Sequence, residues 1–370
     1  MYSKNIHLQK AKGTPDSLLI RHKDGANNNV LVIGSAGSGK TYAYVRPNIL
    51  QGDTSFVTVD INGELYNTTH EALEKKGYKI VQINPAQIGR IIFDFVETQA
   101  EIAELCKALL HKESGDSFWE TMERLAITAI IGALKQTKES VTIKDVCDLL
   151  SSKDYSLFDS LPEDNEFRDL WRTFHATANS TADACLVSLY SELDAMQDLQ
   201  SDTNTVQDPV DFPDISELFA SKIAVFIYIP NFFHDLSSYG RLMAAFVKLL
   251  LEACATVDPK CGHIHFYMDD MLPYRISGAE QLLDSLPSSV DVSLIIQCLD
   301  QLGDKGLQAR IIRHYGVKIL MGGGIIDDAS LDMISKCITP SIDTKDLRHG
   351  LMRKVIMIDD INQEYTLFSF

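Results

Sequence analysis

The chain has 370 residues, of which 45% are hydrophobic and 23% are charged, and its formal net charge is −17. This ordinary globular composition excludes a disordered, collagen-like or coiled-coil protein. Residues 99–214 carry 23 acidic and 9 basic residues, a net charge of −14. Because an acidic block repels phosphate backbones, we expect any nucleic-acid contact on the nearly neutral remainder or in a lumen formed by assembly.

The chain also lacks the patterns of a membrane or secreted protein. Its longest apolar runs, such as 223–229, are far shorter than the ~18 residues of a membrane-spanning helix. The N-terminus has no apolar core of a secretory signal. Seven scattered cysteines without a C-x-x-C pair favour reduced thiols in a cytosolic protein over a zinc site.

After a polar lead-in at residues 1–27, short apolar runs alternate with helical segments along most of the chain. This alternation indicates a mostly parallel α/β sheet flanked by helices. The predicted strands are 28–35, 55–61, 79–84, 222–230, 263–270, 292–298, 317–323 and a final pair within 353–370. The predicted helices of this part are 39–51, 64–77, 236–257, 277–286 and 303–314.

The alternation is interrupted between the third and fourth predicted strands. There the segments 99–112, 116–137 and 180–199 repeat apolar residues at steps of three and four, which is typical of amphipathic helices. A polar, acidic loop follows at 201–214. We therefore predict a discontinuous α/β domain and an all-α insertion domain. The α/β domain comprises 1–98 and 215–370, and the insertion comprises 99–214.

Residues 34–41, GSAGSGKT, match the phosphate-binding pattern G-x-x-x-x-G-K-[ST] between a predicted strand and a predicted helix. The glycines allow a tight turn whose N–H groups face phosphate oxygens at a helix N-terminus. Lys40 is predicted to reach the β- and γ-phosphates, and Thr41 to ligate Mg²⁺. This context favours nucleotide binding over a ligand-free turn. The predicted binding residues are Gly34, Ser35, Ala36, Gly37, Ser38, Gly39, Lys40 and Thr41.

A second acidic motif ends the strand IHFYMDD at Asp269 and Asp270. A nucleotide hydrolase needs a carboxylate for Mg²⁺ and a group that orients water. We assign Asp269 to the metal, and Asp270 to the catalytic position, where related ATPases usually have glutamate. Aspartate is one methylene shorter, so its reach to the attacking water is reduced. The alternative is a strand that simply ends in an acidic turn.

Two further features follow the acidic motif. Gln297 ends the next predicted strand, where an amide can sense the γ-phosphate, although an ordinary strand-end amide is the alternative. Arg313, or else Arg310, is a candidate arginine finger for a neighbouring subunit, and a solvated helix face is the alternative. No N-K-x-D element is present, so a small GTPase is disfavoured and ATP is the expected nucleotide.

In this order the motifs resemble the type IV coupling proteins, the TraG/TraD-like DNA-transfer ATPases of conjugation and type IV secretion. The segments that carry the resemblance are NNNVLVIGSAGSGKTYAYVRPNIL, SFVTVDINGELYNTT, GDSFWETMERLAITAIIGAL, IHFYMDDM, LIIQCLDQL and ILMGGG with ASLDMISKCIT. The resemblance implies a RecA/FtsK-like P-loop NTPase fold that binds ATP and Mg²⁺. It implies Asp269 as the Walker B acid, Asp270 as the catalytic position, and Gln297 as a sensor supported by Gln301.

The resemblance also implies an assembly and partners. It implies a homo-hexameric ring with ATP at the subunit interfaces and single-stranded DNA in the central lumen. The all-α domain would recognise a relaxase, relaxosome or secretion substrate, and the ring would work with the type IV secretion channel. The implied location is the cytoplasm, at the cytoplasmic face of the cell membrane. The charge of −14 on residues 99–214 suits recognition of protein better than contact with DNA.

Three departures from the family pattern qualify these expectations. Asn62 stands where the second-strand motif D-P-K-G-E usually has lysine, and Asp270 replaces glutamate. Family members generally carry an N-terminal membrane anchor, and none precedes the loop at 34–41. We expect a truncated or anchor-less form, or an anchor on another chain. The main functional alternative is an ATP-binding recruitment adaptor that does not hydrolyse ATP, whereas a small-molecule kinase is disfavoured by the acidic insertion.

Overall fold

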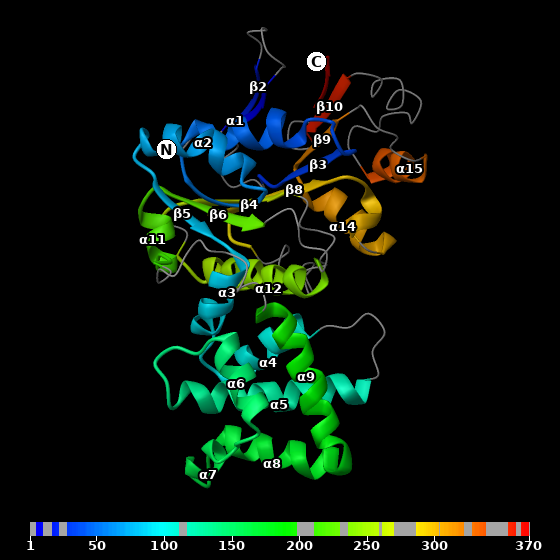
Figure 1. Ribbon diagram of the computed structural model, residues 1–370. Coiled ribbons are helices and arrows are strands. Elements are labelled where there is room, and N and C mark those ends of the chain that lie inside the picture. Colours follow the sequence, from blue (N-terminus) through cyan, green and yellow to red (C-terminus); the bar gives the residue numbers. More distant parts are fainter. Residues whose placement is uncertain are drawn as a thin grey trace. The chain divides into compact units, whose positions relative to one another are not determined.

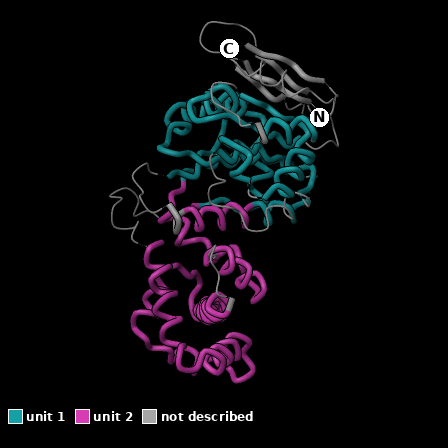
Figure 2. Tube along the Cα trace, turned by 90° about the vertical axis from the view of Figure 1, so that its right-hand side faces the viewer, with its two compact units in different colours: residues 1–82, 212–231, 251–370 teal, residues 83–211, 232–250 magenta. Residues whose placement is uncertain are grey.

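The structure, a computed structural model, describes most of the chain as two compact units (Figure 2). The sheet unit comprises 1–82, 212–231 and 251–370, and the helical unit comprises 83–211 and 232–250. The described residues are 5–9, 17–21, 28–110, 117–197, 211–229, 236–258, 261–269, 286–302, 304–321, 328–337, 354–359 and 364–369.

The sheet unit is built on nine strands in the order β11-β10-β9-β3-β8-β7-β4-β6-β5 (Figure 1). All pairings from β9 to β6 are parallel, whereas β10 is antiparallel to both of its neighbours. Parallel neighbours require long crossover connections, which the helices between the strands supply. The strands are β3 Val30–Gly34, β4 Ser55–Ile61, β5 Lys79–Ile83, β6 Ile223–Ile229, β7 Ile264–Asp269, β8 Val290–Ile296, β9 Val317–Met321, β10 Lys354–Asp359 and β11 Glu364–Ser369.

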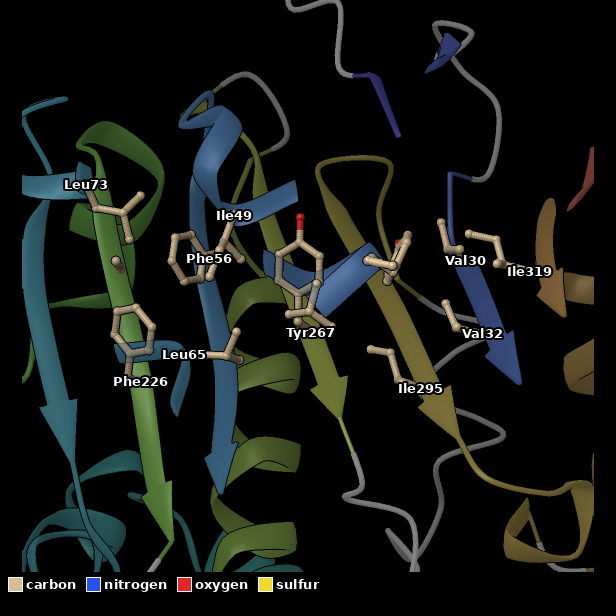
Figure 3. Packing of buried hydrophobic residues seen from close by; sticks show 14 of the residues in the cluster. Val30, Val32, Ile49, Phe56, Leu65, Leu73, Phe226, Tyr267, Ile295 and Ile319 are labelled. Carbon is tan, nitrogen blue, oxygen red and sulfur yellow. The ribbon is translucent and has the colours of Figure 1, made fainter. Parts of the chain in front are cut away.

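The central strands are buried on both faces, which explains why the sequence shows continuous apolar runs rather than alternation. One face packs against a π-helical turn, η1 (Thr41–Val45), and against the helices α1 (Arg46–Gln51) and α2 (Glu64–Glu74). Figure 3 shows side chains of β3, β4, β6, β7, β8 and β9 meeting those of α1 and α2 in this core. The core therefore anchors the first helix after β3 firmly on the sheet.

The remaining helices of the chain fall in both units. The helices after residue 214 are α11 Ile215–Ala220, α12 Leu236–Ala255, α14 Lys305–His314 and α15 Asp328–Cys337, with a 3-10 turn η6 at Leu299–Leu302. The helices between β5 and α11 are α3 Pro85–Ile91, η2 Ile92–Phe95, α4 Gln99–Leu109, α5 Ser117–Lys135, α6 Ile143–Ser152, α7 Leu157–Ser160, α8 Glu166–Ala178, η3 Asn179–Thr181 and α9 Ala182–Gln197.

The helical unit contains no complete strand in its described part, and several of its helices begin with a side-chain cap. Thr98 with Glu101 and Thr142 with Asp145 form reciprocal capping boxes at the starts of α4 and α6. Trp171 of α8 is 8% exposed and lies in an aromatic cluster with Tyr155, Phe158, Phe174 and His175. The unit is thus an apolar helical core with most of its charges outside.

The predicted elements are confirmed wherever the structure describes them, and the structure adds others, among them α3 and α11. Residues 5–9 and 17–21, predicted to be a polar lead-in, form an antiparallel hairpin of β1 (Asn5–Gln9) and β2 (Ser17–Arg21). The predicted helix 277–286 lies outside the described residues except for Leu286, and so does most of the loop 201–214.

The compact units and the predicted domains do not share the same boundaries. The predicted insertion 99–214 lies in the helical unit up to residue 211, and that unit also includes 83–98 and 232–250. The domain boundaries from the sequence therefore stay a prediction. No described helix has the length and apolarity needed to cross a membrane. The side chains of six cysteines are described, and each of them is a free thiol, four buried and two exposed.

Candidate functional site

The carboxyl ends of three neighbouring strands define the candidate site. β8 lies between β3 and β7, with Ile33 paired to Ile296 and Asp269 paired to Ile295. Since parallel strands end at the same edge of a sheet, the loop after β3, Gln297 after β8 and Asp269 of β7 converge there. In open α/β sheets, ligands bind outside such carboxyl ends.

The loop from Gly34 to Thr41 needs glycine for two distinct reasons. Gly37 and Gly39 have φ angles of 75° and 85°, in the left-handed region that side chains rarely adopt. A Cβ atom at either position would meet no other atom within 4 Å, so the backbone conformation, and not a lack of room, requires glycine there. At Gly34, by contrast, a Cβ atom would lie 2.5 Å from Ser38 Oγ and 2.9 Å from Met321 Cβ.

Lys40 is the buried cation of this loop, with 6% of its surface exposed. Its Nζ donates hydrogen bonds to the carbonyl oxygens of Gly34 and Ser35, at 2.7 Å and 3.1 Å. The side-chain oxygens of Ser35 and Ser38 are buried and have no hydrogen-bond partner among the described residues. Buried polar groups normally have partners. An ammonium and two hydroxyls that face a glycine loop therefore fit a bound phosphate group.

Thr41 and Asp269 form the second part of the site. Thr41 Oγ1 donates a 2.7 Å hydrogen bond to Asp269 Oδ2, although the two residues are 228 positions apart in the sequence. Asp269 is the last residue of β7 and is 7% exposed. A hydroxyl and a carboxylate next to a phosphate loop are the oxygen ligands that Mg²⁺ prefers. The structure brings these two predicted metal ligands together.

The structure places the other predicted site residues less closely around the loop. Gln297 is half-buried, and its backbone N–H donates a 2.6 Å hydrogen bond to the side chain of Gln301. This contact links the two glutamines that the resemblance pairs. Arg310 and Arg313 are exposed on α14. Asp270 lies outside the described residues, so its catalytic role stays a prediction.

Sequence reasoning did not assign a role to Asp60. This residue is the last buried residue of β4. Its carboxylate is 1% exposed and accepts hydrogen bonds from the N–H groups of Leu65 and Tyr66, at 2.9 Å and 2.8 Å. Burial raises the pKa of Asp60, and the hydrogen bonds from these two N–H groups oppose the rise. Asp60 therefore fixes the start of α2. The sequence signal for this contact is an acidic residue at the end of an apolar run, four residues before the first helical residue Glu64.

The backbone also explains one departure from the family motif. Asn62 has a φ angle of 66° and Gly63 one of 70°. Asparagine tolerates the left-handed region better than most residues, so Asn62 suits this turn. Separately, His263 and His265 form no metal cluster, because the described residues contain no group of three or more metal-binding side chains.

The sequence profile of the family described as "Type IV secretory system Conjugative DNA transfer" matches residues 3–272. The chain belongs to this family. It is 22% identical over 346 residues to the protein VirD4 of Rhizobium radiobacter, covering 85% of this chain and 48% of VirD4. The chain thus spans about half the length of that family member.

Solved structures of the coupling protein TrwB share the fold of this chain. The unbound monoclinic form of TrwBdeltaN70 superposes with a TM-score of 0.63 at 14% identity, covering 94% of this chain and 86% of that one. TrwB in complex with ADP and Mg²⁺ gives a TM-score of 0.62, also at 14% identity, covering 94% and 85%. The likeness confirms the α/β P-loop NTPase fold predicted from the sequence.

Proposed function

We propose that this protein is an ATP-binding and ATP-hydrolysing coupling protein that recruits DNA or a nucleoprotein substrate and drives it into a type IV secretion or conjugation channel. One observation carries the proposal: the Thr41–Asp269 hydrogen bond next to the loop 34–41. That pair forms a metal site beside a phosphate cradle, in a chain of the conjugative DNA-transfer family.

The chemistry assigns a task to each residue. The loop N–H groups bind phosphate oxygens, and Lys40 exchanges its two loop carbonyls for the β- and γ-phosphates. Thr41 and Asp269 hold Mg²⁺, whose charge, when bound, stabilises the negative charge that develops on the phosphates. Asp270 orients the attacking water. The structure of TrwB with ADP and Mg²⁺ supports this choice of ligands.

Two further residues complete the proposed hydrolytic site. Gln297 senses the γ-phosphate from the end of β8, and Gln301 holds the backbone N–H of Gln297. Arg313, or Arg310, reaches the phosphates of a neighbouring subunit as an arginine finger. The exposure of both arginines on α14 is compatible with a role between subunits.

The proposed assembly is a homo-hexamer with single-stranded DNA in its lumen. Residues 99–214 contact a relaxase, relaxosome or secretion substrate, at the cytoplasmic face of the membrane next to the secretion channel. The net charge of −14 on this segment favours a basic protein surface as its partner. Such binding is expected to weaken as the salt concentration rises.

A second candidate function rests on Asp270. Aspartate reaches one methylene less than the usual glutamate, so the protein is alternatively an ATP-binding recruitment adaptor at the secretion channel that does not hydrolyse ATP. In that case the loop 34–41 binds ATP, and the bound state recruits partners without turnover.

The decisive experiment measures ATP turnover with and without single-stranded DNA for the wild type, Lys40→Ala and Asp270→Asn. Turnover that DNA stimulates and that both substitutions abolish supports the motor. Tight ATP binding without turnover under any DNA or oligomer condition supports the adaptor. An Asp270→Glu variant that gains activity would show that the short side chain limits hydrolysis. Absence of ATP binding by the wild type contradicts both functions.

A further inference from the structure

A buried polar cluster lies in the core of the sheet unit, on the amino side of the candidate site. It consists of Tyr44 of η1, His265 of β7, and Asp291 and Ser293 of β8. None of these side chains is more than 3% exposed. Neither the phosphate loop nor the proposed metal ligands include them. The cluster therefore needs an explanation of its own.

Hydrogen bonds join the helix after the phosphate loop to two strands of the sheet. Tyr44 Oη lies 2.6 Å from Ser293 Oγ, and Ser293 Oγ lies 2.6 Å from His265 Nε2. His265 Nδ1 lies 3.9 Å from Asp291 Oδ2, and the same carboxylate oxygen is bonded to His263 Nε2. The hydroxyls and the imidazole can each act as donor or acceptor, so the chain Tyr44–Ser293–His265 can be hydrogen-bonded throughout, with His265 Nδ1 next to the Asp291 carboxylate.

A core that served stability alone would not need these groups. Burying a hydroxyl, an imidazole and a carboxylate carries a desolvation cost, and apolar residues of similar volume are often as stable or more so. Apolar contacts, however, tolerate small sliding movements. Hydrogen bonds do not, because their energy falls steeply with distance and angle. A buried network of hydrogen bonds therefore fixes the position of what it joins.

The helix is fixed at the same place where the metal site is formed. Thr41 bonds to Asp269 on β7, and Tyr44, three residues later, bonds to Ser293 on β8. Tyr267 of β7 is paired with Ser293 of β8, and Asp269 lies two residues after Tyr267 on the same strand. The bonds from Thr41 and Tyr44 are therefore two residues apart along the strand direction. Together they define both the rotation of the helix about its axis and its shift along the strands.

The local backbone adds a reason for such a restraint. Residues Thr41–Val45 form a π-helical turn rather than an α-helical one. Turns of this kind are rare and are frequently found at functional sites. A π-helical turn that relaxed to α-helix would rotate the Thr41 hydroxyl relative to Asp269. The bond from Tyr44 lies in the same turn and opposes that rotation.

We propose that Tyr44 is a positioning residue: its hydrogen bond to Ser293, held in turn by His265 and Asp291, orients the phosphate-loop helix so that the Thr41 hydroxyl and Asp269 meet at the Mg²⁺ position. This inference rests on the proposed nucleotide site. Tyr44 touches neither nucleotide nor metal and acts through Thr41. Its loss is therefore expected to impair the metal-dependent part of nucleotide binding and not the phosphate cradle.

The test compares Tyr44→Phe with a matched control, Tyr78→Phe. Tyr78 belongs to the same core and is 5% exposed, and its hydroxyl donates a 2.7 Å hydrogen bond to the Thr54 carbonyl oxygen away from the cluster. The affinity of the full chain for a fluorescent ATP analogue is measured in EDTA and across a Mg²⁺ titration. In the same preparations kcat and KM for ATP are measured.

For Tyr44→Phe we expect affinity in EDTA within about twofold of the wild type. The gain in affinity on adding Mg²⁺ should fall about tenfold, so KM for ATP should rise by a similar factor, and kcat should fall about tenfold. These losses are smaller than the ~100-fold that a 1 Å displacement of a catalytic group costs. Tyr78→Phe should match the wild type in every measurement. Ser293→Cys, which keeps the size but weakens the hydrogen bond, should reproduce Tyr44→Phe and replaces it if that variant does not fold.

The outcomes separate this inference from the proposed function. If the wild type shows no Mg²⁺-dependent nucleotide binding, the proposed function fails. If the wild type shows it and Tyr44→Phe keeps the full gain, the positioning role alone is refuted. Equal losses in Tyr44→Phe and Tyr78→Phe would also refute it, because they would reflect general destabilisation of the core.

Discussion

The sheet unit and the helical unit treat polar side chains in opposite ways. Among the described residues, fifteen buried polar or charged side chains lie in the sheet unit and three in the helical unit. In the sheet unit they include Lys40, Asp60, Asp269 and Asp291. Since burial of such groups is costly unless they are bonded, their concentration agrees with the nucleotide chemistry proposed for this unit. The helical unit, with its apolar interior and net acidic sequence, is better suited to a stable recognition surface.

The largest effect that tests this comparison is expected from Trp171→Ala. The Trp171 ring stacks on Phe158 with centroids 4.3 Å apart and planes 3° apart. Its removal leaves a cavity, so the helical unit should lose about 3–5 kcal/mol. Hydrogen exchange should accelerate at the amides of α7 and α8, whereas amides of β4 and β7 keep their protection. Trp119→Ala, at a half-buried position, is the control and should cost much less.

Equal acceleration of exchange in both units after Trp171→Ala would show that they unfold as one cooperative body. The different roles proposed for the sheet unit and the helical unit would then not be accompanied by independent unfolding of the two units. Unchanged exchange in α8 would contradict the structural role of the aromatic cluster itself.

Nucleotide binding tests the same comparison through the stability of the sheet unit. A ligand at 100 times its Kd stabilises the state that binds it by about 2.7 kcal/mol. We expect MgATP to slow hydrogen exchange in β3, η1 and β7 by a corresponding factor and to leave α5 and α8 unchanged. Lys40→Ala should abolish the protection. Protection that appears only in the helical unit would place the nucleotide site outside the loop 34–41.

The sequence predicts this functional half of the molecule well because its signals are local. The glycines and Lys40 of the loop follow directly from spacing, and Asp269 follows from an apolar strand that ends in an acid. The strands could be predicted because strands that are buried on both faces have continuously apolar sequences. The pairing of Thr41 with Asp269 follows from the rule that parallel strands end at one edge.

Other features depend on contacts that no short segment contains. The hairpin of β1 and β2 consists of two five-residue strands, too short for a periodic signal that stands out from a polar lead-in. The bond between Tyr44 and Ser293 depends on the order β3-β8-β7, which the sequence does not specify. The sequence of β7 does not distinguish His265 from an ordinary strand residue, and the fold shows that it is part of a bonded cluster.

Within the helical unit, Gly132→Ala tests how tightly α5 packs on α8. Replacing glycine by alanine inside a helix normally stabilises it by up to about 1 kcal/mol. Here a Cβ atom would lie 2.1 Å from both Cδ1 and Cε1 of Phe167. We therefore expect a loss of about 2 kcal/mol from overpacking, measured by urea denaturation. Gly89→Ala, whose nearest neighbour is Ile143 Cδ1 at 3.4 Å, is the control and should be close to neutral.

A second substitution distinguishes overpacking from an effect on the backbone. Phe167→Leu removes part of the ring and should restore some of the stability lost in Gly132→Ala. If Gly132→Ala is instead stabilising, the contact between α5 and α8 is looser than the structure indicates, and the apolar core of the helical unit is less uniform than the comparison requires.

The smallest expected effect concerns two aspartates that hold helix starts, one in each unit. Asp60 accepts from the N–H groups of Leu65 and Tyr66, and Asp145 accepts from the N–H and hydroxyl of Thr142. Burial raises the pKa of Asp60 above the ordinary 3.8 despite its hydrogen bonds. Burial also acts to raise the pKa of Asp145, but hydrogen bonds from Lys138 and Thr142 outweigh it and lower the pKa below 3.8.

The opposite shifts give opposite dependences on pH. A lowered pKa means that ionised Asp145 stabilises the fold above pH 3.8, so Asp145→Asn should cost about 1 kcal/mol at pH 7. That cost should disappear as the pH falls through the folded pKa. A raised pKa means that the fold favours protonated Asp60, so the wild type should lose stability relative to Asp60→Asn as the pH rises from 3.8 through the folded pKa. Urea denaturation of both variants from pH 3 to 7 measures the two slopes. Slopes of the same sign would mean that the hydrogen bonds to Asp60 compensate its burial as fully as those to Asp145 do. The sheet unit would then carry no electrostatic cost for the geometry of its site.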